Sequence, residues 1–235
     1  MEKEKPKNPA SRLYSILSRL KQIPGTNPCA SSFGGILEVP GGNQMLLLER
    51  VGRATALMRR AREQTLALNA PEHYLEWFEP VQNAFFNLNL GATLEEFTQK
   101  LSPVTLEQLK FCATNLSERF GEPDLAKEEA AHVLEEIDEL IKETKESQMD
   151  ESARQYVLRH LSQIAQALRE YELFGVDPVR EQVSGAIGSA LFQQREAQAA
   201  GKKFWEFIFN RVCPLVQTGA AAIYIGEQFT KLLLK

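Results

Sequence analysis

Cysteine is scarce in this chain: among 235 residues there are three, Cys29, Cys112 and Cys213, and they lie far apart. One of them has no partner in any pairing scheme, so the sequence argues against a disulfide framework and a zinc knuckle. Such a chain suits a reducing compartment, and we expect a cytoplasmic protein. Because residues 1–7, Met-Glu-Lys-Glu-Lys-Pro-Lys, lack the apolar core of a signal peptide, we expect a solvated tail over residues 1–10.

An excess of charge of one sign is also missing. The formal net charge is −4, which gives no reason to expect general nucleic-acid binding. The basic residues cluster only once, at Arg50, Arg53, Arg59, Arg60 and Arg62. No aromatic side chains are interleaved with these arginines to stack on bases, so we interpret the cluster as a solvated helix face.

Motifs for nucleotides and metals are absent too. The glycines between Pro24 and Asn43 are not followed by a lysine as in a phosphate-binding loop, and they lack the dinucleotide-binding spacing. The carboxylates between Glu135 and Glu139 come without a Glu-x-x-His pattern, which favours a solvated acidic face. Histidine, cysteine and serine form no recognisable nucleophile motif. We predict no cofactor and no metal, and the sequence leans away from an enzyme.

Helical periodicity, in contrast, runs through most of the chain. Apolar residues recur at steps of three and four, and no segment alternates as a strand does. We predict an all-α protein, a bundle of about eight or nine helices that are mostly antiparallel neighbours. We divide it into an N-terminal helical part, 11–121, with a Gly/Pro-rich loop at 24–43, and a C-terminal helical part, 122–235, packed together as one domain.

The central feature is a pair of helices between Leu125 and Phe174, joined at about Met149-Asp150. One apolar stripe comprises Ala130, Val133, Ile137, Leu140 and Ile141, and the other comprises Val157, Leu161, Ile164, Leu168 and Tyr171. Two such stripes joined by a short polar turn are predicted to pack as an antiparallel pair. Further on, the segment from Ser184 to Ala190 has small side chains, which indicates close contact between helices.

A second long stripe holds a heptad rhythm between Gln44 and Leu68, which makes coiled-coil-like packing credible. The alanines in this stripe would let a neighbouring helix approach closely. We predict that it is an interaction face, formed by Leu47, Val51, Ala54, Met58 and Ala61.

The segment from Phe204 to Leu234 is the most hydrophobic part of the chain. Its candidate contact residues for a membrane or a partner are Phe204, Trp205, Phe207, Gly219, Tyr224 and Gly226. The glycines and alanines resemble the small-residue faces of helices that pack in lipid. However, the uninterrupted apolar run is shorter than the roughly 20 residues of a spanning helix, so a buried core helix is the favoured interpretation.

Arg154 and His160 form an Arg-x5-His pattern near the start of a predicted helix. This pattern resembles the short signature of HEPN-type ribonucleases, which are helical dimers that cleave RNA without a metal. The resemblance implies that His160 would act as a general base and Arg154 as a phosphate clamp. The family usually has a small polar residue after the arginine, whereas this chain has Gln155.

The region from Val157 to Gly188, together with the Ala/Gly-rich C-terminal segment, resembles a group of bacterial all-helical proteins of unknown role. The resemblance implies a bacterial source and an all-α fold. Our first hypothesis is a non-enzymatic interaction or scaffold protein. Its partner would be a second copy of itself or another protein. The first alternative is a membrane-acting effector of a bacterial antiviral defence or toxin system, using residues 204–234 and associated with the membrane when active. The second alternative is a metal-independent HEPN-like ribonuclease.

Overall fold

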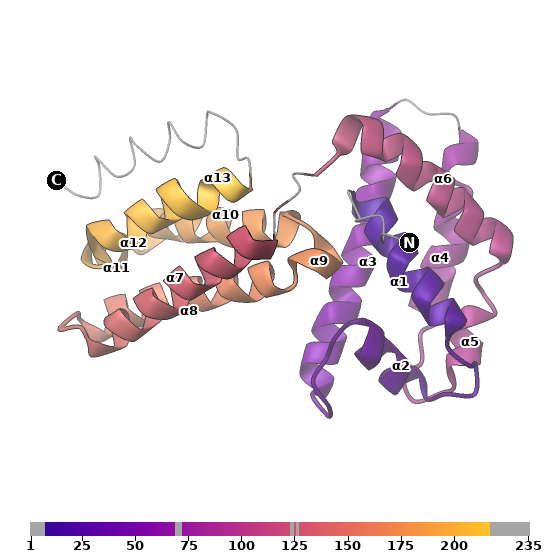
Figure 1. The fold of residues 1–235 in the computed structure, drawn as a ribbon, viewed down its shortest axis with the longest axis horizontal. Helices are drawn as coiled ribbons and strands as arrows, with labels where there is room; N and C mark the ends of the chain where they lie inside the picture. Colours follow the sequence, from indigo (N-terminus) through magenta and orange to yellow (C-terminus); the bar gives the residue numbers. More distant parts are fainter. Residues whose placement is uncertain (1–7, 69–71, 123–124, 126, 217–235) are drawn as a thin grey trace. The chain divides into compact units, whose positions relative to one another are not determined.

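The computed structural model describes residues 8–68, 72–122, 125 and 127–216 (Figure 1). These residues contain no β-strand, only an isolated bridge between Pro28 and Thr93. The helices of seven or more residues are α1 (Pro9–Gln22), α2 (Cys29–Ile36), α3 (Gln44–Ala67), α4 (Phe78–Phe86), α6 (Pro103–Phe120), α7 (Lys127–Glu146), α8 (Glu151–Arg169), α10 (Asp177–Phe192) and α12 (Gly201–Phe207). The shorter helical segments are η1 (Glu72–Leu75), α5 (Leu94–Thr98), α9 (Tyr171–Phe174), α11 (Gln194–Ala199), the π-helical turn η2 (Ile208–Val212) and α13 (Cys213–Leu215). The predicted all-α fold is confirmed.

The described residues form two compact units, each with a hydrophobic core of its own. Unit 1 comprises the residues up to Glu122 together with Leu173–Gly175. Unit 2 comprises the residues after Glu122 except these three. That the two helical parts pack as one domain stays a prediction.

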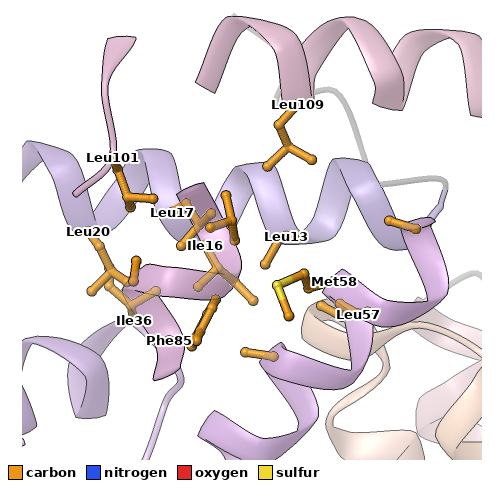
Figure 2. Packing of buried hydrophobic residues seen from close by; sticks show 14 of the residues in the cluster. Leu13, Ile16, Leu17, Leu20, Ile36, Leu57, Met58, Phe85, Leu101 and Leu109 are labelled. Atoms are coloured by element: carbon orange, nitrogen blue, oxygen red, sulfur yellow. The ribbon is translucent and has the colours of Figure 1, made fainter. Parts of the chain in front are cut away.

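Helix α1 is the central helix of unit 1 and packs against both α3 and α6 (Figure 1). Its apolar side chains recur at helical spacing, so one face of the helix points into the core. Figure 2 shows this face, with Leu13 beside Met58 of α3 and Leu20, farther along α1, beside Ile36 of α2.

The solvated tail predicted for residues 1–10 is wrong for residues 8–10, because Asn8 caps α1 and Pro9 begins it. The Asn8 side chain accepts a hydrogen bond from the Ser11 amide at 2.9 Å. Its amide nitrogen donates to the Ala113 carbonyl at 2.8 Å and to Ser117 Oγ at 2.7 Å, both on α6. An asparagine cap followed by a proline is a strong helix start, and these long-range bonds fix it against a second helix.

The predicted loop at 24–43 is also partly wrong, because it contains helix α2. Two glycines, Gly34 and Gly35, lower the helix propensity of this segment, which is why its sequence favours a loop. The burial of Cys29, Phe33 and Leu37 in the core of unit 1 compensates for this low propensity. Arg50 of α3 donates to the Leu37 and Glu38 carbonyls at 2.6 Å each, just past the end of α2.

A buried ion pair lies in unit 1. Arg12 of α1 and Glu122 are 2.8 Å apart, with 3% and 8% of their side chains exposed. Gly175 lies directly against this pair with a φ of +83°, and a Cβ atom there would come within 2.5 Å of a Glu122 carboxylate oxygen. Glycine is therefore required at this position both by the backbone conformation and by the close approach of the ion pair.

In unit 2, α7 and α8 lie side by side as the antiparallel pair that the sequence predicts (Figure 1). Helix α10 packs against α8 and brings Val179, Val183 and Ala190 into the core of unit 2. The π-helical turn η2 precedes Pro214, which has no N–H to donate to the Asn210 carbonyl four residues earlier. The amide of the residue before it, Cys213, donates to the Ile208 carbonyl five residues earlier, which is the wider π-helical spacing.

Candidate functional site

Three polar side chains meet inside unit 2, between α8 and α10. Ser189 Oγ lies 3.0 Å from His160 Nε2 and 3.1 Å from the Tyr156 hydroxyl. The Tyr156 hydroxyl donates to the Ala186 carbonyl at 2.9 Å. Ser189 Oγ donates to the same carbonyl at 2.9 Å. The His160 ring packs edge-on against the Tyr156 ring, with centroids 4.6 Å apart. We call Tyr156, His160 and Ser189 the buried polar cluster.

The hydrogen bonds of this cluster determine where the histidine carries its proton. Because the Ser189 hydroxyl donates to Ala186, Ser189 Oγ is available to accept a hydrogen bond from His160 Nε2. His160 Nδ1 is buried and has no partner among the described residues. With the proton on Nδ1, that nitrogen would be a buried donor without an acceptor, which is rarer in proteins than a buried acceptor without a donor. The favoured tautomer therefore carries its proton on Nε2.

The surroundings keep this imidazole neutral at pH 7. His160 is only 5% exposed. Burial, together with the nearby charge of Arg159, lowers the pKa of His160 to about 4. Burial also raises the pKa of the Tyr156 hydroxyl, so tyrosine stays protonated as well.

This geometry suits a structural role better than a catalytic one. In a nucleophilic serine–histidine pair the ring nitrogen next to the serine must accept the serine proton. In the tautomer that burial of Nδ1 favours, His160 Nε2 is the donor, and no carboxylate among the described residues is bonded to Nδ1 to favour the other tautomer. The buried polar cluster therefore joins α8 to α10 through matched hydrogen bonds.

We expect that Ser189→Ala will destabilise unit 2 by about 1–3 kcal/mol, because it leaves the buried Nε2–H of His160 without an acceptor. Urea unfolding followed by Trp205 fluorescence measures this, in a Trp77→Phe background, because the chain's other tryptophan, Trp77, lies in unit 1. The matched control is Ser162→Ala, an exposed serine on α8 in the same unit. Equal effects of the two substitutions would contradict the assignment.

The pair that resembles the HEPN signature does not share partners in this structure. The guanidinium of Arg154 donates to the Met149 carbonyl at 3.3 Å and lies 3.0 Å from Glu151. These contacts are at the start of α8, whereas His160 is bonded to Ser189 of α10. The ribonuclease hypothesis stays a prediction and gains no support from this geometry.

The stripe predicted as an interaction face lies in the core of unit 1. Leu47, Ala54, Met58 and Ala61 are buried, and Val51 packs partly buried against them. The heptad rhythm thus reflects packing within the chain, since α1 covers this side of α3.

The described part of the C-terminal segment is core as well. Phe204, Trp205 and Phe207 are buried in unit 2, and the Trp205 indole donates to the Ala197 carbonyl at 2.9 Å. Gly219, Tyr224 and Gly226 lie outside the described residues. Within the described ranges, no helix has both the length and the apolar character needed to cross a membrane.

The acidic face of α7 carries basic partners from its own unit. Arg211 donates to both carboxylate oxygens of Glu136, at 2.6 and 2.8 Å, which holds the pKa of Glu136 below its usual range. Lys203 pairs with Glu143, and His132 Nε2 lies 3.2 Å from Glu136. The described residues contain no group of three or more histidine, cysteine or carboxylate side chains able to hold a metal ion.

The surface also carries a feature that the sequence analysis did not identify as a site. At the C-terminal end of α10, Leu191 is 61% exposed and Phe192 is 90% exposed. They are consecutive residues, and both lie on the side of α10 away from the core residues Val183 and Ala190. The sequence signal for this surface is the run of small residues just before them, which by itself indicates only close helix contact.

Comparison with known proteins identifies no relative: no family model, no curated protein and no solved structure matches this chain.

Proposed function

We propose that this protein is a non-enzymatic interaction protein that associates with a second copy of itself. The observation that supports the proposal most is the exposure of Leu191 and Phe192 together on the outer side of α10. Burying one such side chain contributes about 1.5–3 kcal/mol, so two side by side favour association. The cytoplasmic location and bacterial source remain predictions from the sequence.

Exposed apolar residues elsewhere support the proposal less. The other exposed large apolar residues, all in unit 1, lie on three helices: Met45, Leu48 and Leu66 on α3, Phe86 on α4, and Val104 and Phe111 on α6. None of them is next to another in the sequence, and none is as exposed as Phe192, whereas large exposed apolar side chains side by side indicate an interaction site. The buried polar cluster argues in the same direction, because its histidine is buried and hydrogen-bonded to a serine of the neighbouring helix.

We expect the full chain to show concentration-dependent self-association in sedimentation equilibrium, and Phe192→Ser to weaken it about tenfold or more. The matched control is Phe86→Ser, which replaces an equally exposed phenylalanine in unit 1 and should leave the association unchanged. A parent chain that stays monomeric over the whole concentration range would overturn the proposal.

A further inference from the structure

The outer face of α10 is continuous and lies opposite its core face. At 100° per residue, the residues within about 60° of Gly188 are on one side of the helix. From Glu181 to the end of the helix they are Glu181, Ser184, Gly185, Gly188, Leu191 and Phe192. The buried residues Val179, Val183, Ala186 and Ala190 lie on the other side.

The centre of this outer face is open. A Cβ atom built on Gly185 or Gly188 would meet no atom within 4 Å beyond the helix's own backbone. These glycines therefore do not serve packing within the described residues, although each costs up to about 1 kcal/mol of helix stability relative to alanine. Glycine in a helix is useful where another backbone approaches closely.

We propose that the outer face of α10 docks against the same face of a second copy, with the two α10 helices antiparallel about a two-fold axis at Gly188. This proposal rests on the self-association proposed above and names the surface and geometry that produce it. An isologous interface of this kind has to be self-complementary, because every contact between one residue of the first copy and another of the second is repeated with the two copies exchanged.

The register around Gly188 meets that requirement for size. Leu191 is three residues after Gly188 and Gly185 is three residues before it, so the axis brings Leu191 of one copy level with Gly185 of the other, on the other flank of the face. In the same way Phe192 comes level with Ser184. Each large exposed side chain thus has a small residue of the other copy beside it at the same height, and this arrangement occurs twice.

The charges at the two ends of the face are complementary as well. Glu181 is exposed toward the N-terminal end, and Arg195, which is 82% exposed, follows the C-terminal end. The Arg159 guanidinium is held at that same end by its hydrogen bond to Gln193 at 3.0 Å. An antiparallel arrangement brings Glu181 of each copy to the end that carries the arginines of the other, where its carboxylate is shared with the interaction that Glu181 makes within its own chain. The contact between Arg195 and Asp150, at 3.6 Å between exposed groups, is weak enough to exchange.

The size of the outer face of α10 determines how tightly two copies are expected to associate. One face of a helix of 16 residues is smaller than the about 800 Å² per partner typical of stable complexes. We therefore expect a reversible dimer that forms as the protein concentration is raised.

Disulfide trapping in the full chain tests the geometry. Gly188→Cys places a thiol on the proposed axis, where helices about 8–10 Å apart bring opposed Cα atoms within the about 7 Å reach of a disulfide. The three native cysteines are buried, so the new thiol is the exposed one. We expect rapid formation of a covalent dimer under mild oxidation. The matched control is Gly52→Cys, on an exposed and equally open helix position of α3, which should stay uncrosslinked.

Gly188→Ala distinguishes a role of Gly188 in contact with a second copy from a role within its own helix. It should raise the urea midpoint of unit 2, because alanine favours helix, and at the same time weaken self-association about tenfold. An effect on stability alone, with unchanged association, would overturn the proposed interface.

The outcomes also separate the two proposals. If the Gly188→Cys chain associates but forms no covalent dimer, the α10 interface is overturned and the proposed function stands. A monomeric chain overturns both proposals. If the thiol introduced by Gly188→Cys also resists maleimide labelling in such a monomer, the face is covered by another segment of its own chain.

Discussion

Lowering the pH from about 7 to about 4 will destabilise unit 2 by about 3 kcal/mol through a single side chain, His160. The cause is the burial of its imidazole, which lowers the pKa from 6.5 to about 4 in the folded protein. About one pH unit or more above 6.5 the imidazole is neutral in both the folded and the unfolded chain, so it contributes no pH dependence there.

The direction of the effect follows from which state binds the proton first. Below pH 6.5 the unfolded chain takes up a proton that the folded chain does not, and the folded state loses stability. The loss continues until the pH reaches about 4, where the folded imidazole protonates as well. This window lies mostly above the range in which carboxylates titrate.

Urea unfolding at a series of pH values between about 7 and about 4 measures the effect, with Trp205 fluorescence reporting on unit 2 in the Trp77→Phe background. His160→Gln keeps a donor for Ser189 and has no titrating group, so its profile should be flatter than that of the parent. His132→Gln is the control, because that histidine is in the same unit with 62% of its side chain exposed. Parallel profiles for the parent and His160→Gln would contradict the prediction.

Replacing Glu122 by glutamine will destabilise unit 1 by about 3–5 kcal/mol, because it removes the carboxylate 2.8 Å from a buried arginine. The pair is 2.8 Å apart and both side chains are almost fully buried, so solvent cannot replace the lost carboxylate. Urea unfolding followed by Trp77 fluorescence, in a Trp205→Phe background, measures the change in the free energy of unfolding.

Two further variants define the origin of that loss. Arg12→Met combined with Glu122→Gln should recover part of the stability, because the buried guanidinium that lost its carboxylate is then gone. Asp138→Asn breaks the exposed pair with Arg169 in unit 2, and it should cost less than about 1 kcal/mol. If Glu122→Gln costs no more than Asp138→Asn, the buried ion pair contributes little to unit 1.

Periodicity predicts the helices of this chain well because it reports which face of a helix is apolar. The stripes on α7 and α8 and the stripe on α3 all coincide with buried faces. What periodicity cannot identify is the element that covers the face. The stripe containing Ala54 and Met58 suggests a surface for a partner, whereas the chain's own α1 covers it.

Local propensity fails where tertiary contacts outweigh it. The glycines of α2 favour a loop, yet the buried side chains of Cys29, Phe33 and Ile36 hold this segment as a helix. The tail prediction fails in the same way at Asn8, whose partners Ala113 and Ser117 lie more than a hundred residues away in the sequence.

The buried polar cluster can be predicted only in part. His160 stands out in the sequence through its spacing from Arg154, a residue with which it shares no partner in the structure. Its hydrogen-bond partner Ser189 lies 29 residues away on another helix. The run of small residues around Ser189 does predict a close helix contact, but it cannot distinguish the two sides of α10. Alanines pack toward α8 on one side, and glycines lie open on the other.

The membership of Leu173–Gly175 in unit 1 has a consequence for how the protein is made. On the ribosome, the residues up to Glu122 emerge first, but Phe174 and Gly175 are still to be synthesised. Phe174 belongs to the core of unit 1, where the Arg53 guanidinium lies 6.0 Å from the centre of its ring. Unit 1 of the nascent chain therefore cannot complete its core until much of unit 2 has been translated. A gene fragment that ends after the codon for Glu122 encodes a unit 1 without Leu173–Gly175.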